Sequence, residues 1–203
     1  MNEKELTQTE IDEIIEGQIK NERHLNGKND SAGVRVLANS VSNRMNNIIA
    51  TNITIAVGSR VQGQKCELYV NDMPVKLDDK HVCYPDVVIV SGNPAFVDNQ
   101  STMLTNPTVA FDVFSKNTSF QDKTEKLECY LAMASIREYV LIKEDEMRVE
   151  HYSKQNPKQW VYKIYNERDD VISLDSINCK VSIAEIYAQV KFSSAEAQAK
   201  AVK

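Results

Sequence analysis

The sequence lacks a long hydrophobic run, and no apolar stretch approaches the roughly 18 residues that a membrane-spanning helix needs. The first five residues, MNEKE, also lack the basic and then apolar regions of a signal peptide. These absences predict a protein without a membrane segment, and we expect it to be cytoplasmic.

Paired metal-ligand motifs are also missing. The chain has four cysteines: Cys66, Cys83, Cys129 and Cys179. No two of them form a C-x-x-C pair, which disfavours zinc, so we interpret them as buried structural thiols in a reducing compartment. The three histidines are His24, His81 and His151. They show no metal-ligand spacing and are interpreted as surface or core residues.

The sequence motifs of several enzyme classes are also absent. The sequence contains no G-x-G-x-x-G, no Walker loop, no H-E-x-x-H and no G-x-S-x-G. The formal net charge of -5 argues against a protein that coats nucleic acid through bulk electrostatics. A nuclease remains compatible with this charge, because a metal site contributes acidic residues of its own and a local basic strip can coexist with an acidic remainder.

What is present is the composition of a globular domain. The chain has 203 residues, 42% of them hydrophobic and 26% charged, which suits one ordinary core. We expect a flexible N-terminus over residues 1–8, a single domain over 9–192, and a flexible or helical Ala/Lys/Gln tail over 193–203.

Hydrophobic periodicity predicts alternating groups of helices and strands. The expected helices are a short segment ending at Gly17, the amphipathic stretch 34–49, the segment after Thr118 and a short one at 183–187. The expected strands are residues 53–57, 66–70, 87–90, 108–114, 139–142, 147–152, 160–165 and 171–174. This order predicts a mixed α/β (α+β) fold, with a central mixed β-sheet flanked by helices and antiparallel C-terminal strands.

Two of the expected strands carry acidic residues. Asp86 stands at the entrance of the strand 87–90, and Asp112 lies within the apolar run VAFDVF. An ionised carboxylate among apolar residues costs several kcal/mol unless it is paired or binds a metal, so Asp112 needs a partner. Lys126 follows in the next expected helix. Two acids on neighbouring strands and a lysine on the following helix form the set that a Mg²⁺-dependent phosphodiesterase requires.

Each of these residues also has a structural interpretation. Asp86 follows a proline and could be a turn residue. Asp112 could face solvent or a salt-bridge partner, and an edge strand with one exposed face would allow this because side chains alternate between the two faces. Lys126 lies four residues after Asp122, and such pairs stabilise an exposed helix by ~0.2 to 0.5 kcal/mol.

Four blocks of sequence, in order, resemble one known family. They are YPDVVIV at 84–90, FDVFSKNT at 111–118, D-x-x-x-K-x-x-x-Y at 122–130 and REYVLI at 137–142. The chain resembles the Uma-type restriction endonuclease family of the PD-(D/E)XK nuclease superfamily, loosely from residue 16 to 187. The resemblance implies a restriction-endonuclease-like fold, metal-dependent phosphodiester hydrolysis and a homo-oligomer, which we expect to be a dimer.

The resemblance also assigns site residues. Asp86 matches the Asp of the first motif, and Asp112 stands where most relatives have Glu. The usual Lys position falls at Phe114, so Lys126 matches the family's relocated Lys. Relatives often have Glu after the Gly of the first helix region. Here Gln follows that Gly, and Glu16 is the substitute.

These matches imply a mechanism. Asp86, Asp112 and the Val113 carbonyl are expected to bind one Mg²⁺ or Mn²⁺, with Glu16 as an outer ligand. The ion would polarise the scissile phosphate of nucleic acid, with DNA as the expected substrate, while Lys126 orients the attacking water or neutralises charge. The competing hypothesis is a catalytically degenerate nuclease fold that serves as a nucleic-acid- or protein-binding module. A third is a purely structural oligomerising domain.

Overall fold

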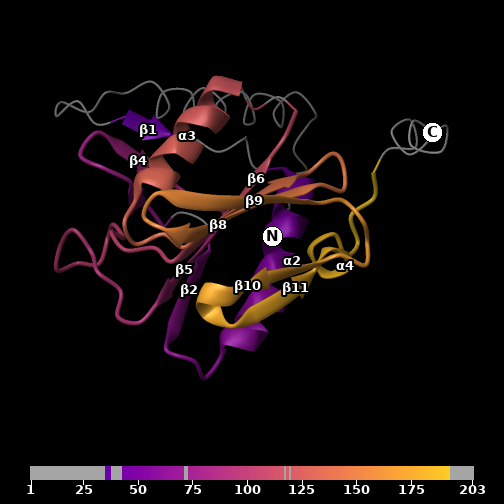
Figure 1. Cartoon of the computed structure of the whole chain (residues 1–203), viewed down its shortest axis with the longest axis horizontal. Coiled ribbons are helices and arrows are strands. Elements are labelled where there is room, and N and C mark those ends of the chain that lie inside the picture. The colour runs from indigo at the N-terminus through magenta and orange to yellow at the C-terminus, as the bar shows by residue number, and fades with distance from the viewer. Residues whose placement is uncertain (1–34, 38–42, 71–72, 117, 119, 193–203) are drawn as a thin grey trace, which may run out of the picture.

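A six-stranded mixed sheet forms the centre of the molecule, with strand order β2-β5-β6-β7-β8-β9 (Figure 1). The computed structural model describes residues 35–37, 43–70, 73–116, 118 and 120–192. The strands of this sheet are β2 (Cys66–Val70), β5 (Val87–Ser91), β6 (Val109–Phe114), β7 (Glu138–Lys143), β8 (Val149–Asn156) and β9 (Gln159–Tyr165). The β6–β7 pair is parallel and the other neighbouring pairs are antiparallel. This confirms the predicted mixed sheet.

A parallel pair needs a crossover connection, and α3 (Phe120–Ala132) supplies it between β6 and β7. In Figure 1, α3 lies on one side of the sheet, while β10 (Val171–Leu174), β11 (Cys179–Ser182) and α4 (Ile183–Ile186) lie on the other with α2 (Arg44–Val61). The 3-10 turn η1 (Asp175–Ile177) joins β10 to β11. The sheet is therefore covered on both faces.

A second, three-stranded sheet lies beside α3, with the order β1-β4-β3 (Figure 1). Its strands are β1 (Arg35–Leu37), β3 (Val75–Lys76) and β4 (His81–Cys83). The β1–β4 pair is parallel and the β3–β4 pair antiparallel. This small sheet brings the segment before β5 close to the helix that carries Lys126.

Side-chain alternation divides the core into two clusters. Residues of β5, β6 and β7 that face α2 pack with that helix and with β10 and β11, and they include Ile89, Phe111 and Val140. Their neighbours along the same strands pack on the α3 side with Tyr130. Asp112 alternates with Phe111, so it lies on the α3 face.

Two predictions in the first half of the chain were wrong. The stretch 34–49 was expected to be one helix, but its beginning forms β1, and α2 starts only at Arg44. Residues 53–57 were expected to be a strand because they are rich in β-branched side chains, yet they continue α2 to Val61. Burial at helical spacing explains this outcome: Ile49, Ile53 and Val57 recur every four residues and are fully buried against the sheet.

The remaining expected strands, the helix after Thr118 and the short helix near residue 183 lie close to their observed places, whereas β3, β4 and β11 were not expected. The predicted segment ending at Gly17, the N-terminus 1–8 and the tail 193–203 lie outside the described residues. Among the helices of the described part of the chain, none is long and apolar enough to cross a membrane.

Candidate active site

Asp86 lies immediately before β5 and extends the hydrogen-bond ladder of that strand with its side chain. The β5–β6 pairing ends at Val87 opposite Phe111. Beyond that point the N–H of Val113 has no β5 residue opposite it, and it donates instead to Asp86 Oδ2 at 2.7 Å. The Nδ2 of Asn46, in the first turn of α2, donates to Asp86 Oδ1 at 3.2 Å. Strand and helix together hold the Asp86 carboxylate in place.

Asp112 lies in the middle of β6 and is only 3% exposed. Lys126 Nζ, from α3, donates to Asp112 Oδ1 at 2.7 Å. The Tyr139 hydroxyl, from the neighbouring strand β7, donates to Asp112 Oδ2 at 2.7 Å. Both carboxylate oxygens therefore have partners, as the burial of a charge demands.

The structure excludes a solvent-facing Asp112 and an exposed helical pair for Lys126, and it gives Asp112 a salt-bridge partner in Lys126. β6 lies between β5 and β7 and all of its residues are buried, so Asp112 is not on an edge strand. Lys126 is 5% exposed and turns toward the sheet, so it is not part of an exposed helical pair. The sequence argument that Asp112 needs a partner agrees with this geometry.

Asp86, Asp112 and Lys126 interact electrostatically. Burial, and next the charge of Asp112, raise the pKa of Asp86 to about 6, although the N–H of Val113 acts in the opposite direction. Burial, the largest influence, would lower the pKa of Lys126, but the charge and hydrogen bond of Asp112 together with smaller contributions from neighbouring groups outweigh it, and the pKa rises. Two carboxylates with one ammonium leave one negative charge in excess when all three groups are ionised, and burial makes this excess costly.

A layer of aromatic and thiol groups covers this charged cluster from the α3 side. The rings of Tyr130 and Tyr139 have centroids 4.3 Å apart. Cys83 Sγ lies 2.9 Å from the Tyr130 hydroxyl, and both residues are fully buried. Burial raises the pKa of Cys83 to about 12, so this cysteine stays a neutral thiol and packs as a structural residue.

The sequence analysis assigned no role to Asn46 or Tyr139, although both contact the cluster. A signal for Asn46 was available: it is a polar residue beside the apolar positions of α2, and it is 2% exposed. Tyr139 falls within the REYVLI block. Its role depends on the parallel register of β6 and β7, which sets Tyr139 opposite Ala110 and Leu141 opposite Asp112. That register cannot be read from the sequence.

The remaining predicted residues divide into three groups. Val113 lies in β6 with its N–H on Asp86, while Glu16 and His24 lie outside the described residues. Cys83 and Cys179 are buried thiols as expected, but Cys66 and Cys129 are only partly buried.

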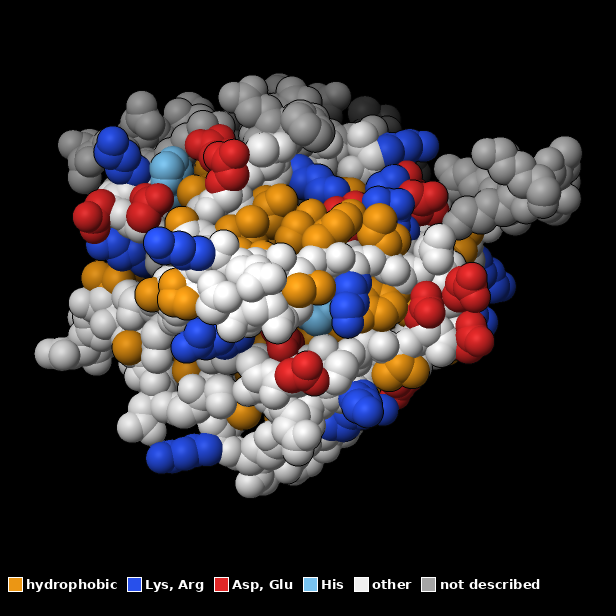
Figure 2. All heavy atoms as spheres, viewed as in Figure 1, with side chains coloured by type: hydrophobic (Ala, Val, Ile, Leu, Met, Phe, Trp, Pro, Cys, Tyr) orange, Lys and Arg blue, Asp and Glu red, His pale blue; other side chains and the backbone are white. Residues whose placement is uncertain are grey.

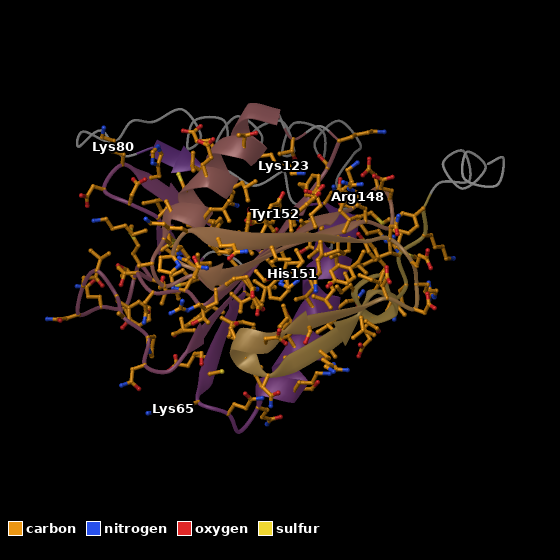
Figure 3. The ribbon with its side chains drawn as sticks, viewed as in Figure 1. Lys65, Lys80, Lys123, Arg148, His151 and Tyr152 are labelled. Carbon is orange, nitrogen blue, oxygen red and sulfur yellow. The ribbon has the colours of Figure 1, made fainter. Side chains whose placement is uncertain are left out.

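Basic groups lie next to the cluster on the α3 face of the sheet. Lys123, one turn before Lys126, contacts Glu150 Oε2 at 3.1 Å, and Arg148 Nε contacts Glu150 Oε1 at 3.2 Å. In Figure 3, Lys123 and Arg148 lie on the same side of β8 as Tyr152. Lys123 and Arg148 share the single carboxylate of Glu150, so the surface around Glu150 has an excess of positive charge although the protein as a whole is acidic.

This combination of a mixed sheet with a parallel crossover and a carboxylate–carboxylate–lysine cluster on one face defines a nuclease-like fold of the restriction-endonuclease class. The chain belongs to the Uma2 family, whose model carries the description "Putative restriction endonuclease" and matches residues 33–185. The predicted family relationship is therefore confirmed.

Two proteins of Synechocystis sp. are similar in sequence. The "Uncharacterized protein sll1609" is 30% identical over 125 residues, which cover 61% of this chain and 68% of the relative. The "Uncharacterized protein slr1290" is 21% identical over 160 residues, covering 78% and 82%. A solved structure from Anabaena variabilis, titled as a "putative nuclease belonging to DUF820", superimposes with a TM-score of 0.63 at 16% identity, covering 75% of this chain and 86% of the other. At this identity the likeness shows the fold.

Proposed function

We propose that this protein is a metal-dependent endonuclease that hydrolyses phosphodiester bonds of DNA, with Mg²⁺ or Mn²⁺ as its cofactor. The observation that carries the proposal is the meeting of Asp86, Asp112 and Lys126, from three different elements, in one cluster on the α3 face. Membership of the Uma2 family supports the same reaction class.

The donor set of the cluster fits a hard divalent cation. Asp86 and Asp112 offer carboxylate oxygens, which Mg²⁺ and Mn²⁺ prefer. The excess negative charge, which contributes to the raised pKa of Asp86 through Asp112, favours the arrival of a cation. The N–H and C=O of a strand residue point to the same side, so the Val113 carbonyl is directed toward the side on which its N–H meets Asp86. We therefore propose Asp86, Asp112 and the Val113 carbonyl as ligands, with Glu16 as an outer ligand.

The protein's own groups would position the reaction. A bound divalent ion supplies Lewis-acid polarisation of the scissile phosphate and activation of the attacking water. Lys126 holds a positive charge beside Asp112, where it can neutralise charge that develops on the phosphate. Tyr139 and Asn46 fix the orientation of the two carboxylates. Lys123 and Arg148 lie nearby and can contact the DNA backbone.

A homodimer is the assembly we propose, because two copies would bring two such clusters to the two strands of a duplex. β9 is an edge strand whose Tyr162 and Ile164 are 46% and 43% exposed. Figure 2 shows hydrophobic side chains exposed over β8 and β9, with Lys and Arg beside them. Sedimentation equilibrium of the full chain tests this, and a monomer at all concentrations would contradict it.

The test of the reaction is a cleavage assay. Full-length protein is incubated with supercoiled plasmid, linear duplex, single-stranded DNA and RNA, in Mg²⁺, in Mn²⁺ or in a chelator. We expect metal-dependent cleavage of DNA that is lost in Asp86→Ala and in Asp112→Ala. Asp169→Ala is the matched control, since Asp169 is exposed and should leave cleavage unchanged. Cleavage that persists in both site variants would point to a contaminant or to another site.

Calorimetry separates this proposal from a degenerate binding module. An active site of this kind should bind Mn²⁺ or Mg²⁺ in the millimolar range or below, and Asp112→Ala should remove the heat of binding. DNA binding without any metal binding or cleavage would favour the binding module.

A further inference from the structure

A second group of metal-binding side chains lies between α3 and the small sheet, apart from the Asp86–Asp112 cluster. Asp78, in the turn before β4, His81, on β4, and Cys129, on α3, each offer a ligand atom, and these atoms lie within 4.8 Å of one another. The strand β4 and the helix α3 lie side by side in Figure 1. Residues of β4 and the turn before it thus converge with a residue of α3 at one surface position.

The contacts around His81 fix the arrangement. His81 Nδ1 lies 2.8 Å from Asp78 Oδ2, and Asp78 Oδ1 accepts the backbone N–H groups of Lys80 and His81 at 2.7 and 2.9 Å. On its other side, His81 Nε2 lies 3.5 Å from Glu125 Oε1. Glu125 precedes Cys129 by one helical turn, so both lie on the same face of α3.

The charge balance at this position favours a cation. The carboxylates of Asp78, Glu125 and Glu128 all act electrostatically on the Cys129 thiol. The His81 ring lies between two of them, Asp78 and Glu125. A divalent ion would offset this negative charge and displace the thiol proton.

We propose that Asp78, His81 and Cys129 form a Zn²⁺ site with three protein ligands, whose fourth position is taken by water. A thiolate sulfur and an imidazole nitrogen select a borderline-soft ion, whereas the all-oxygen Asp86–Asp112 cluster suits a hard one. Zinc bonds of ~2.0 Å to nitrogen or oxygen and ~2.3 Å to sulfur separate tetrahedral ligands by roughly 3.5 Å, so closing the site takes shifts of about 1 Å.

The three protein ligands link α3 to the small sheet, and Glu125, beside the other ring nitrogen, can orient the imidazole. The link matters because α3 also carries Lys126. The side chains of His81 and Asp78 are 22% and 50% exposed, so an ion can enter from solvent without unfolding. This site was not predicted from the sequence: Asp78 and His81 are close along the chain, but Cys129 lies far from them on another element.

Cobalt is the probe, because a cobalt–thiolate bond produces a charge-transfer absorption in the near ultraviolet that imidazole and carboxylate ligands do not. Full-length protein, first freed of metal with a chelator, is titrated with Co²⁺. We expect the thiolate band to appear, Zn²⁺ to abolish it stoichiometrically, and Zn²⁺ to raise the melting temperature. Cys129→Ser should remove the band, and His81→Asn should weaken Co²⁺ binding by about tenfold or more.

Two controls make the result specific. Cys66→Ser removes a partly buried thiol elsewhere and should leave the band intact, and Asp86→Asn should leave it intact while it impairs Mg²⁺ or Mn²⁺ binding. The proposal is overturned if wild-type protein binds Co²⁺ without a thiolate band, or if the band survives Cys129→Ser. In either case the cluster is an ion-paired histidine only.

Discussion

Lys126 donates a 2.7 Å hydrogen bond to Asp112 at a place where both side chains are almost fully buried. The pair joins α3 to the central strand β6, and Asp86 adds a second carboxylate close enough to have its pKa raised by Asp112. The lysine is therefore the cation on which two buried acids depend.

Replacing Lys126 with Met should destabilise the protein by about 3 to 5 kcal/mol, because it leaves two buried carboxylates without a counter-charge. The free energy of unfolding from urea denaturation at neutral pH measures this. Lys123→Met is the control on the same helix. Lys123 is partly exposed and Arg148 still pairs with Glu150 in its absence, so the cost should stay below about 1 kcal/mol. Equal losses in the two variants would contradict the role given to Lys126.

Tyr139→Phe tests the second hydrogen bond to Asp112. Loss of the hydroxyl leaves Asp112 Oδ2 without its donor in a buried place, which should cost about 1 to 3 kcal/mol. Mn²⁺ affinity measured by calorimetry should change as well, because the carboxylate is no longer oriented. Tyr152→Phe is the matched control on the next strand, opposite Tyr139, where the hydroxyl bond to Glu150 is 3.4 Å long and the effect should be small.

Only some of the residues in this cluster could be predicted from the sequence. Asp112 could be recognised because an acid within VAFDVF must find a partner, and the partner lies on the next helix. Tyr139 and Asn46 could not be assigned in the same way. Their contacts depend on the register of a parallel strand pair and on where α2 meets the sheet, both of which are set by distant parts of the chain.

The wrong element predictions have a related cause. The β-branched residues around Ile53 favour a strand locally, but as a helix they present Ile49, Ile53 and Val57 to the sheet. Burial of that face outweighs the small difference in propensity. The strand β1 forms by parallel pairing with β4, more than forty residues later in the chain. No local sequence pattern predicts it.

Gly58 offers a test of the same helix. Gly58 lies inside α2, and a Cβ added there would meet only Leu68 Cδ1 at 3.9 Å, an ordinary contact. Gly58→Ala should therefore stabilise the protein by about 0.5 to 1 kcal/mol, because alanine loses less backbone freedom in a helix. A rise in the urea midpoint with an unchanged slope checks this, and a fall would mean that α2 packs more tightly against β2 at this point.

Glu138 and His151 form a buried pair on the other face of the sheet, and both are 3% exposed. Glu138 Oε2 lies 3.9 Å from His151 Nε2, and neither atom has a hydrogen-bond partner among the residues that the structure describes. Burial raises the pKa of Glu138 to about 7 and lowers the pKa of His151 to about 4. In the folded protein each group thus favours its neutral form.

The two groups should make stability depend on pH in opposite directions. Glu138 keeps a proton that the unfolded chain releases near pH 4.5. Its contribution to the free energy of unfolding therefore falls as pH rises from about 4.5 to 7. His151 stays neutral in the folded protein at pH values where the unfolded chain takes up a proton, near pH 6.5. Its contribution to the free energy of unfolding therefore falls as pH drops from 6.5 to about 4. In the wild-type protein these slopes largely cancel.

Single variants should reveal each slope. Relative to wild type, Glu138→Gln should become more stable as pH rises through 4.5 to 7, and His151→Gln should become more stable as pH falls through 6.5 to 4, by up to about 3 kcal/mol in each case. Urea denaturation across this range measures the differences, and subtracting the wild-type curve removes the titration of other groups such as Asp86. Because each variant removes one titrating group and leaves the other in place, the two difference curves must slope in opposite directions. Two flat curves would mean that Glu138 and His151 reach water in the folded protein and titrate there as they do in the unfolded chain.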